Sequence, residues 1–206
     1  MAPDAPNLPQ SSPGRVVPLF PLPDVWLFPF VVLPLHVFEP RYRQMIEDIL
    51  DDVGRLVLGT IQAGHEHEAP GSPPIYPIAG LGEIGRHERL PDGRFKILLV
   101  GLQRVFVRET ESTRLYRQVE VHPAPEVPLR KREEAELRAP LLAALRERMK
   151  DLPERSEGFT TSYLVDMLLL RMPLPHELMN ELYSELDPAR RARAALAQHA
   201  QRPKLD

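Results

Sequence analysis

Apolar residues follow two different periods along this chain, and the change falls near residue 125. Before it, short apolar runs and alternating segments predict β-strands at 31–33, 35–38, 56–62, 95–100, 103–108 and 117–122. One helix interrupts them, because a helical face is formed by Tyr42, Met45, Ile46, Ile49 and Leu50. Pro40 suits the first turn of that helix and Gly54 its end. The tripeptide Pro91-Asp92-Gly93 predicts a turn between two strands.

After residue 125 the apolar residues recur with the 3.6-residue period of helices. A first stripe predicts a helix that is kinked or restarted at Pro140, with apolar positions Leu137, Leu141, Leu142, Leu145, Met149 and Leu152. Further helices are predicted from Thr160 to about residue 171, from near Pro175 and from Asp187, which precedes a proline. The pattern therefore predicts an α+β fold, in which a β-rich module is followed by a helical bundle.

Domain boundaries follow from these changes of pattern. Residues 1–14 are rich in Pro, Ser and Asn and are expected to form a disordered tail. We expect the β module at 15–122, a proline-rich linker at 123–128, and the helical bundle at 129–206. The bundle is expected to pack on the β module, because its apolar stripes need a packing partner.

The segment 16–38 is apolar over a length that could cross a bilayer as a helix. Its composition argues against that, because it contains Asp24 and the prolines Pro18, Pro21, Pro23, Pro29 and Pro34. Each proline inside a helix costs ~3 kcal/mol, and lipid offers no water to the freed carbonyls. We interpret the segment as extended chain in a protein core. Since the preceding residues also lack the features of a signal peptide, a cytoplasmic location is expected.

Charge and cysteine content remove several classes of function. The 26 basic and 29 acidic residues give a formal net charge of −3, so the chain has no basic surplus for binding nucleic acid. The absence of cysteine excludes disulfides, thiolate zinc sites and a cysteine nucleophile.

The glycines Gly80, Gly82 and Gly85 match the spacing of a dinucleotide-binding fingerprint. That fingerprint requires a helix directly after it, to receive the pyrophosphate at its N-terminus. Here a short polar stretch runs straight into the turn at residue 91, which favours a strand whose glycines allow close approach of a neighbour. With no G-x-x-x-x-G-K-[ST] phosphate loop either, no cofactor is expected.

Candidate catalytic and metal-binding residues are few. His65 and His67 lie two residues apart in the polar stretch GHEHE, whereas zinc hydrolases use H-E-x-x-H on a helix. We interpret the stretch as a solvated loop in which these two histidines are weak candidates for adventitious metal binding. No serine lies in a G-x-S-x-G frame, so no catalytic residue is predicted.

Three alternating aromatic residues, Trp26, Phe28 and Phe30, include the only tryptophan. In an extended strand the alternation would place all three on one side. That side belongs either to the core or to an exposed shelf that binds a partner, since aromatic rings dominate binding hot spots.

The order of several motifs resembles a known family. These are PLFPL within 18–22, FEPRY within 38–42, VLGTI, IAGLGEI, and LPDGRFKILLVGLQRVFV. Together they resemble the N-terminal substrate-binding domain of the Lon protease family, closely over about 16–120 and more loosely in the helical remainder. The resemblance implies a PUA-like β pseudobarrel of about six strands followed by a helical bundle.

In the full-length protease this domain precedes an ATPase module and a Ser–Lys peptidase domain, and neither follows here before Asp206. The resemblance therefore implies a non-enzymatic module that binds unfolded polypeptide segments or a protein partner. Two alternatives stay open at this stage. One is an RNA-binding PUA-like protein, and the other is a small-molecule pocket protein that uses His65, His67 and His87.

Overall fold

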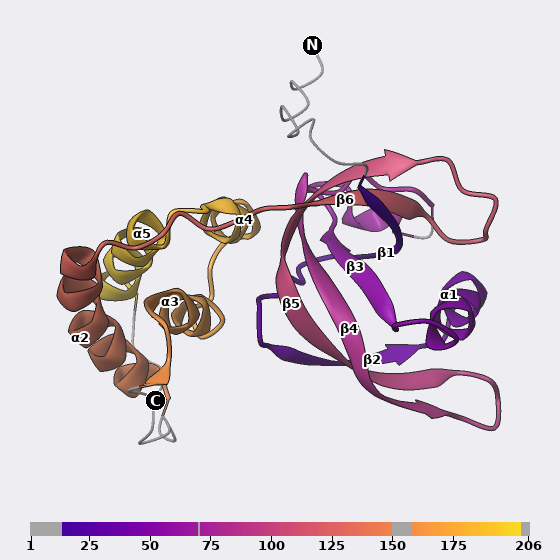
Figure 1. Cartoon of the computed structure of the whole chain (residues 1–206), viewed down its shortest axis with the longest axis horizontal. Coiled ribbons are helices and arrows are strands. Elements are labelled where there is room, and N and C mark those ends of the chain that lie inside the picture. The colour runs from indigo at the N-terminus through magenta and orange to yellow at the C-terminus, as the bar shows by residue number, and fades with distance from the viewer. Residues whose placement is uncertain (1–13, 70, 150–157, 203–206) are drawn as a thin grey trace, which may run out of the picture. The chain divides into compact units, whose positions relative to one another are not determined.

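The computed structural model describes residues 14–69, 71–149 and 158–202 (Figure 1). The predicted tail at 1–14 therefore lies outside the described residues, except for Gly14. The chain divides into two compact units, a β unit (Met1–Ala124) and a helical unit (Pro125–Asp206). The described residues form five α-helices, one short 3-10 turn and six strands: β1 Arg15–Leu22, β2 Val32–Val37, β3 Arg55–Thr60, β4 Ile78–Arg89, β5 Phe95–Thr110 and β6 Gln118–Pro123. The predicted α+β class is confirmed.

The described strands form one sheet in the order β2-β5-β4-β3-β1-β6, and β5 also pairs with β6. β5 can serve both because it is 16 residues long. Its first part pairs with β2 and its last part with β6. The strands β5, β4, β3, β1 and β6 therefore close into a ring, while β2 lies outside the ring as an edge strand. This is the predicted pseudobarrel, with one strand that does not belong to the closed circuit.

The interior of the β unit holds the residues that the helical spacing predicts. Helix α1 (Pro40–Leu50) buries Tyr42, Met45, Ile46 and Ile49. They join a cluster that contains Phe20 of β1 and Phe95 of β5. The apolar segment 16–38 contributes extended chain to this core only in part, through β1 and through Leu33, Leu35 and Val37 of β2. Among the helices in the described part of the chain, none has the length and apolar character needed to cross a membrane.

Glycines shape β4 and β5 at the predicted places. Gly93 adopts a φ of 80° in the turn between the two strands, where its N–H donates to Leu90 O over 2.9 Å. The three fingerprint glycines all lie within β4, and a strand rather than a helix follows them. A Cβ on Gly82 would come within 2.9 Å of Leu27 and Leu99, so this glycine is required by core packing.

The helical unit contains α2 Lys131–Arg148, α3 Thr161–Leu169, α4 His176–Ser184 and α5 Pro188–Ala200. Thr160 caps α3 by accepting the Tyr163 N–H over 3.2 Å, and Asp187 caps α5, as their sequence positions predict. α2 runs as one helix through Pro140, so it is not restarted there.

A buried cation holds the start of the helical unit together. Arg191 on α5 is fully buried and forms ion pairs with Asp166, over 3.1 Å, and with Glu126. Glu126 also accepts a hydrogen bond from Ser162 over 2.6 Å. Removing one partner of such a buried ion pair leaves the other charge buried without compensation, which destabilises the fold. The network therefore holds Glu126, in the segment predicted as a linker, against the helices.

Candidate binding surface

The three alternating aromatic residues do not share one face. The segment 23–31 is not a strand, because turns occur at 23–24 and at 29–30. Phe28 is fully buried, Trp26 is partly buried, and Phe30 is 70% exposed. The prediction of one extended aromatic stripe is therefore wrong, because the segment is not a strand and the three residues differ in exposure.

Phe28 belongs to the core, and its backbone lies directly on β5. A Cβ on Gly101 would come within 2.0 Å of Phe28 O, so only glycine allows this approach. The guanidinium of the buried Arg104 lies 5.3 Å from the centroid of the Phe28 ring. These contacts fix the turn that follows.

Phe30 occupies a backbone position that normally holds glycine. Its φ is +65°, and Val31 N donates to Phe28 O over 3.3 Å, as in a type II turn with Pro29 at its second position. Phe30 N also donates to Gly101 O over 2.7 Å, and Gly101 N donates to Val31 O over 2.9 Å. That bonding pattern makes Phe30 the first residue of a bulge of the type that usually has a left-handed glycine there.

The left-handed backbone conformation of Phe30 has an energetic cost. A bulky L-residue in the left-handed region loses roughly 1–2 kcal/mol relative to ordinary backbone. The Phe30 ring recovers little of it by burial, because 70% of the residue is exposed. A strained, rigidly held and exposed aromatic ring is a preorganised contact for a partner.

Strand β2 extends the exposed apolar surface beyond Phe30. Leu33, Leu35 and Val37 face the core. The intervening residues Val32, Pro34 and His36 are exposed, and Phe38 after the strand is 60% exposed. Sequence reasoning missed this face because the segment was interpreted as buried, although Pro34 within a strand is itself a signal of an edge.

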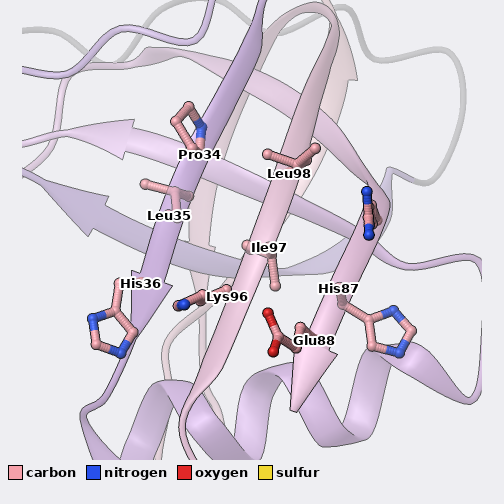
Figure 2. A pocket seen from close by; sticks show the side chains of 9 residues that line it. Pro34, Leu35, His36, His87, Glu88, Lys96, Ile97 and Leu98 are labelled. Carbon is pink, nitrogen blue, oxygen red and sulfur yellow. The ribbon is translucent and has the colours of Figure 1, made fainter. Parts of the chain in front are cut away.

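The neighbouring strands complete what we call the outer patch, defined as Val32, Pro34, His36, Lys96, Leu98, Val100, Arg86 and Glu88. Figure 2 shows side chains from β2, β5 and β4 around a hollow in this region. The hollow has a volume of about 470 Å³, within the range of ligand-binding clefts. It is lined by apolar side chains such as Leu98 beside charged ones such as Lys96.

The charges of the outer patch are weakly positive. Lys96 lies opposite His36 on one side and Glu88 on the other. Within the described part of the chain, neither Lys96 nor Arg86 forms an ion pair, and Glu88 is the one acid that lines the hollow. Two cations against one carboxylate leave a positive charge, which favours an acidic group on a ligand.

The predicted histidine candidates do not gather at one site. His65 Nδ1 lies 2.8 Å from Glu68 Oε1 in a 3-10 turn, whereas His87 lies on β4 beside the hollow. In residues 14–69, 71–149 and 158–202 no group of three potential metal ligands occurs. The geometry therefore gives the small-molecule hypothesis based on these histidines no support.

Two tyrosines with raised pKa values lie in the core and not in the outer patch. Burial raises the pKa of Tyr42 to about 12. Burial and the hydrogen bond that Tyr116 donates to Asp48 over 2.8 Å raise the pKa of Tyr116 to about 12. Both tyrosines belong to the cluster around α1. Their pKa shifts therefore reflect packing, and they do not indicate a reactive site.

Comparison with known proteins matches most of the chain to one family. The family model described as the ATP-dependent protease La (LON) substrate-binding domain matches residues 16–198. Lon protease 2 of Sorangium cellulosum is 27% identical over 200 residues, which are 92% of this chain and 25% of that protein. The Lon protease of Desulfovibrio desulfuricans is 32% identical over 117 residues, which are 57% of this chain and 13% of that protein. The chain thus spans a quarter or less of these two curated relatives.

Solved structures agree on the fold. The N-terminal domain of a Lon protease from the Mycobacterium avium complex is similar with a TM-score of 0.72 and 18% identity, covering 92% of this chain and all of that one. A Lon N-terminal domain protein from Xanthomonas campestris is similar with a TM-score of 0.66 and 24% identity, covering 89% of this chain and 98% of that one. The matched motifs, the fold and the extent of the family match together show that this chain belongs to the Lon substrate-binding domain family.

Proposed function

We propose that this chain captures apolar segments of polypeptides in the cytoplasm and does no chemistry on them. The observation that carries the proposal is Phe30, an exposed ring held at a backbone position that favours glycine. Aromatic anchors of this kind supply most of the energy of protein interfaces. Membership of a substrate-binding domain family supports a protein as the partner.

The outer patch supports the same class of ligand. Val32 is 52% exposed and Leu98 is 37% exposed on adjacent strands, beside the hollow. Contiguous apolar surface of this kind on a soluble domain is typical of an interaction site. Together with the ring of Phe30 it offers a partner several apolar contacts in the same unit.

Substitution of Phe30 separates binding from folding. In Phe30→Gly the ring is lost but the left-handed strain is relieved, so the free energy of unfolding should stay the same or rise by up to about 1 kcal/mol. Binding of fluorescein-labelled casein, an unfolded polypeptide, should weaken about thirtyfold in fluorescence anisotropy titrations. Phe30→Ala should lose the same affinity while keeping the strain.

Leu115→Ala is the matched control, because Leu115 is 67% exposed in the loop between β5 and β6, at the opposite end of β5 from Lys96, Leu98 and Val100. Casein affinity should be unchanged in this variant. If both Phe30 variants bind casein as the wild type does, the proposal is wrong. Casein incubated with the protein and ATP should also stay full length on a gel, and cleavage that co-purifies with the chain would contradict a purely binding role.

A further inference from the structure

We infer that the captured segment binds as an additional β-strand along the open edge of β2, with apolar residues at alternate positions and an acidic residue beside His36 and Lys96. This inference rests on the proposed function and specifies how the segment is held. It follows from the direction of the backbone groups of β2, from the position of Pro34, and from the charges of the outer patch.

The backbone hydrogen bonds of β5 show which N–H and C=O groups of β2 point outward. Gly101 N donates to Val31 O, so the odd-numbered residues that follow in β2 bond to β5. The pairing on the other side of β5 leads to the same result. Leu90 N donates to Arg94 O, so the backbone N–H and C=O groups of Lys96 and Leu98 point toward β4 and not toward β2. The N–H and C=O groups of Val32 and His36 consequently point away from β5.

No strand occupies that side within the described residues. β2 stands at the end of the strand order and has β5 as its ladder neighbour. An edge with free N–H and C=O groups is a template for an incoming extended chain, and natural proteins block such edges when they must not bind.

Pro34 limits this edge without closing it. It lies between Val32 and His36, where its missing N–H would have pointed outward, so the ladder to β5 loses nothing. Its carbonyl still accepts a hydrogen bond. The edge therefore keeps two donors and three acceptors, enough for a short strand that dissociates, and too few for an extensive permanent pairing.

The side chains define the chemistry of the occupant. A strand added beside β2 places every second side chain next to Val32, Pro34 and His36, where the first two positions favour apolar residues. His36 lies directly opposite Lys96, which has no ion-pair partner in the described part of the chain. A carboxylate on the added strand beside His36 would face this pair of basic side chains.

Amide hydrogen exchange followed by NMR tests the inference residue by residue. The probe is a synthetic peptide that alternates Val or Leu with Thr and carries one central Asp. On saturation, the exchange of the Val32 and His36 amides should slow at least about tenfold, because each gains an acceptor. The amides of Leu33 and Leu35 already bond to β5 and should change little. Thr113, in an exposed bend, is the control amide and should not change.

A proline substitution tests the same donors by affinity. His36→Pro removes an outward N–H and should weaken peptide binding about five- to tenfold, whereas His36→Ala keeps that N–H and should lose less. If His36→Pro does not fold, the exchange measurement on the wild type still decides.

The outcomes separate the two proposals. If the peptide binds but the Val32 and His36 amides exchange as in the free protein, the strand addition is wrong while capture of polypeptides stands. If neither the peptide nor casein binds, the proposed function itself fails. Slow exchange at Val32 and His36 without peptide, together with a dimer in sedimentation, would show that a second copy of the chain occupies the edge and would overturn the inference.

Discussion

Strands β1 and β2 come from the same apolar, proline-rich segment, yet only β1 is buried on both faces. The residues Val17 to Pro21 of β1 are buried without interruption, whereas in β2 exposed and less exposed residues alternate. In β1, Val17 and Leu19 pack in one core cluster and Phe20 packs in another. The inner residues of β2 pack against one of these clusters, and its outer residues belong to neither.

The difference arises from the place of each strand in the sheet. β1 pairs with β6 through its first residues and with β3 through its last, and both belong to the closed ring. β2 pairs with β5 alone among the described strands. Both strands are apolar in composition, but their positions in the sheet decide whether the second apolar face is buried by other parts of the chain. The unsatisfied face of β2 is where a partner can gain the burial energy that β1 already has.

Alanine substitutions in the two strands should show the difference most strongly. Leu19→Ala in β1 removes a fully buried side chain and should lower the free energy of unfolding by about 2–5 kcal/mol. Val32→Ala in β2 removes a side chain that is 52% exposed and should change it by no more than about 0.5 kcal/mol. Urea denaturation of both variants measures these changes. A Val32→Ala variant as unstable as Leu19→Ala would mean that the outer face of β2 is covered.

Replacing Pro34 sharpens the contrast at the edge. Pro34→Val adds an outward N–H between Val32 and His36, so β2 would present an uninterrupted edge like that of an unprotected strand. The change in unfolding free energy should be a loss of no more than about 1 kcal/mol, from the greater entropy of the unfolded chain. The main effect should be self-association that grows with concentration in sedimentation velocity. Pro91→Val in the hairpin turn is the control, and association of both variants alike would contradict a role for the β2 edge.

Local signals in the sequence were sufficient for much of the fold. The spacing of Tyr42, Met45 and Ile49 predicts α1 because a helix face is defined within a few turns, and Gly93 predicts its turn because only its own φ is involved. The caps at Thr160 and Asp187 are local in the same sense. These elements lie where the sequence places them.

The binding surface depends on partners that are distant in the chain. The glycine-like conformation of Phe30 requires Gly101, which a reading of the alternating aromatics does not include. The exposure of Val32 depends on strand order, which no local window contains. The alternation in the sequence therefore groups Trp26, Phe28 and Phe30 together, although Phe28 is core, Trp26 is partly buried and Phe30 is exposed. Pro34 was the available signal, since central strands seldom tolerate proline.

The smallest of the expected effects is a pH dependence of the free energy of unfolding, which arises from a carboxylate beside the start of β1. Glu120 on β6 accepts the N–H of Gly14, just before β1, over 2.9 Å and also pairs with Arg108. The hydrogen bond from the Arg108 guanidinium, followed by that from Gly14, holds the pKa of Glu120 below its ordinary value of 4.5. The unfolded chain therefore takes up this proton at a higher pH than the folded chain does. The stabilising contribution is present above the ordinary value and is lost as the pH falls through the lowered pKa.

Glu120→Gln should remove this contribution at neutral pH and flatten the acid limb of the stability curve, because glutamine has no proton to gain. Urea midpoints measured from about pH 7 to about pH 3 should show wild type and variant converging in acid. Glu111→Gln, at an exposed loop carboxylate, is the control and should run parallel to the wild type. If the difference in urea midpoint between wild type and Glu120→Gln stays constant with pH, the side chain stabilises the fold through its packing and not through the charge of its carboxylate. No equivalent carboxylate bond to a β2 backbone amide occurs in the described residues, so the acid sensitivity should belong to the β1 end of the sheet and leave the β2 edge unchanged.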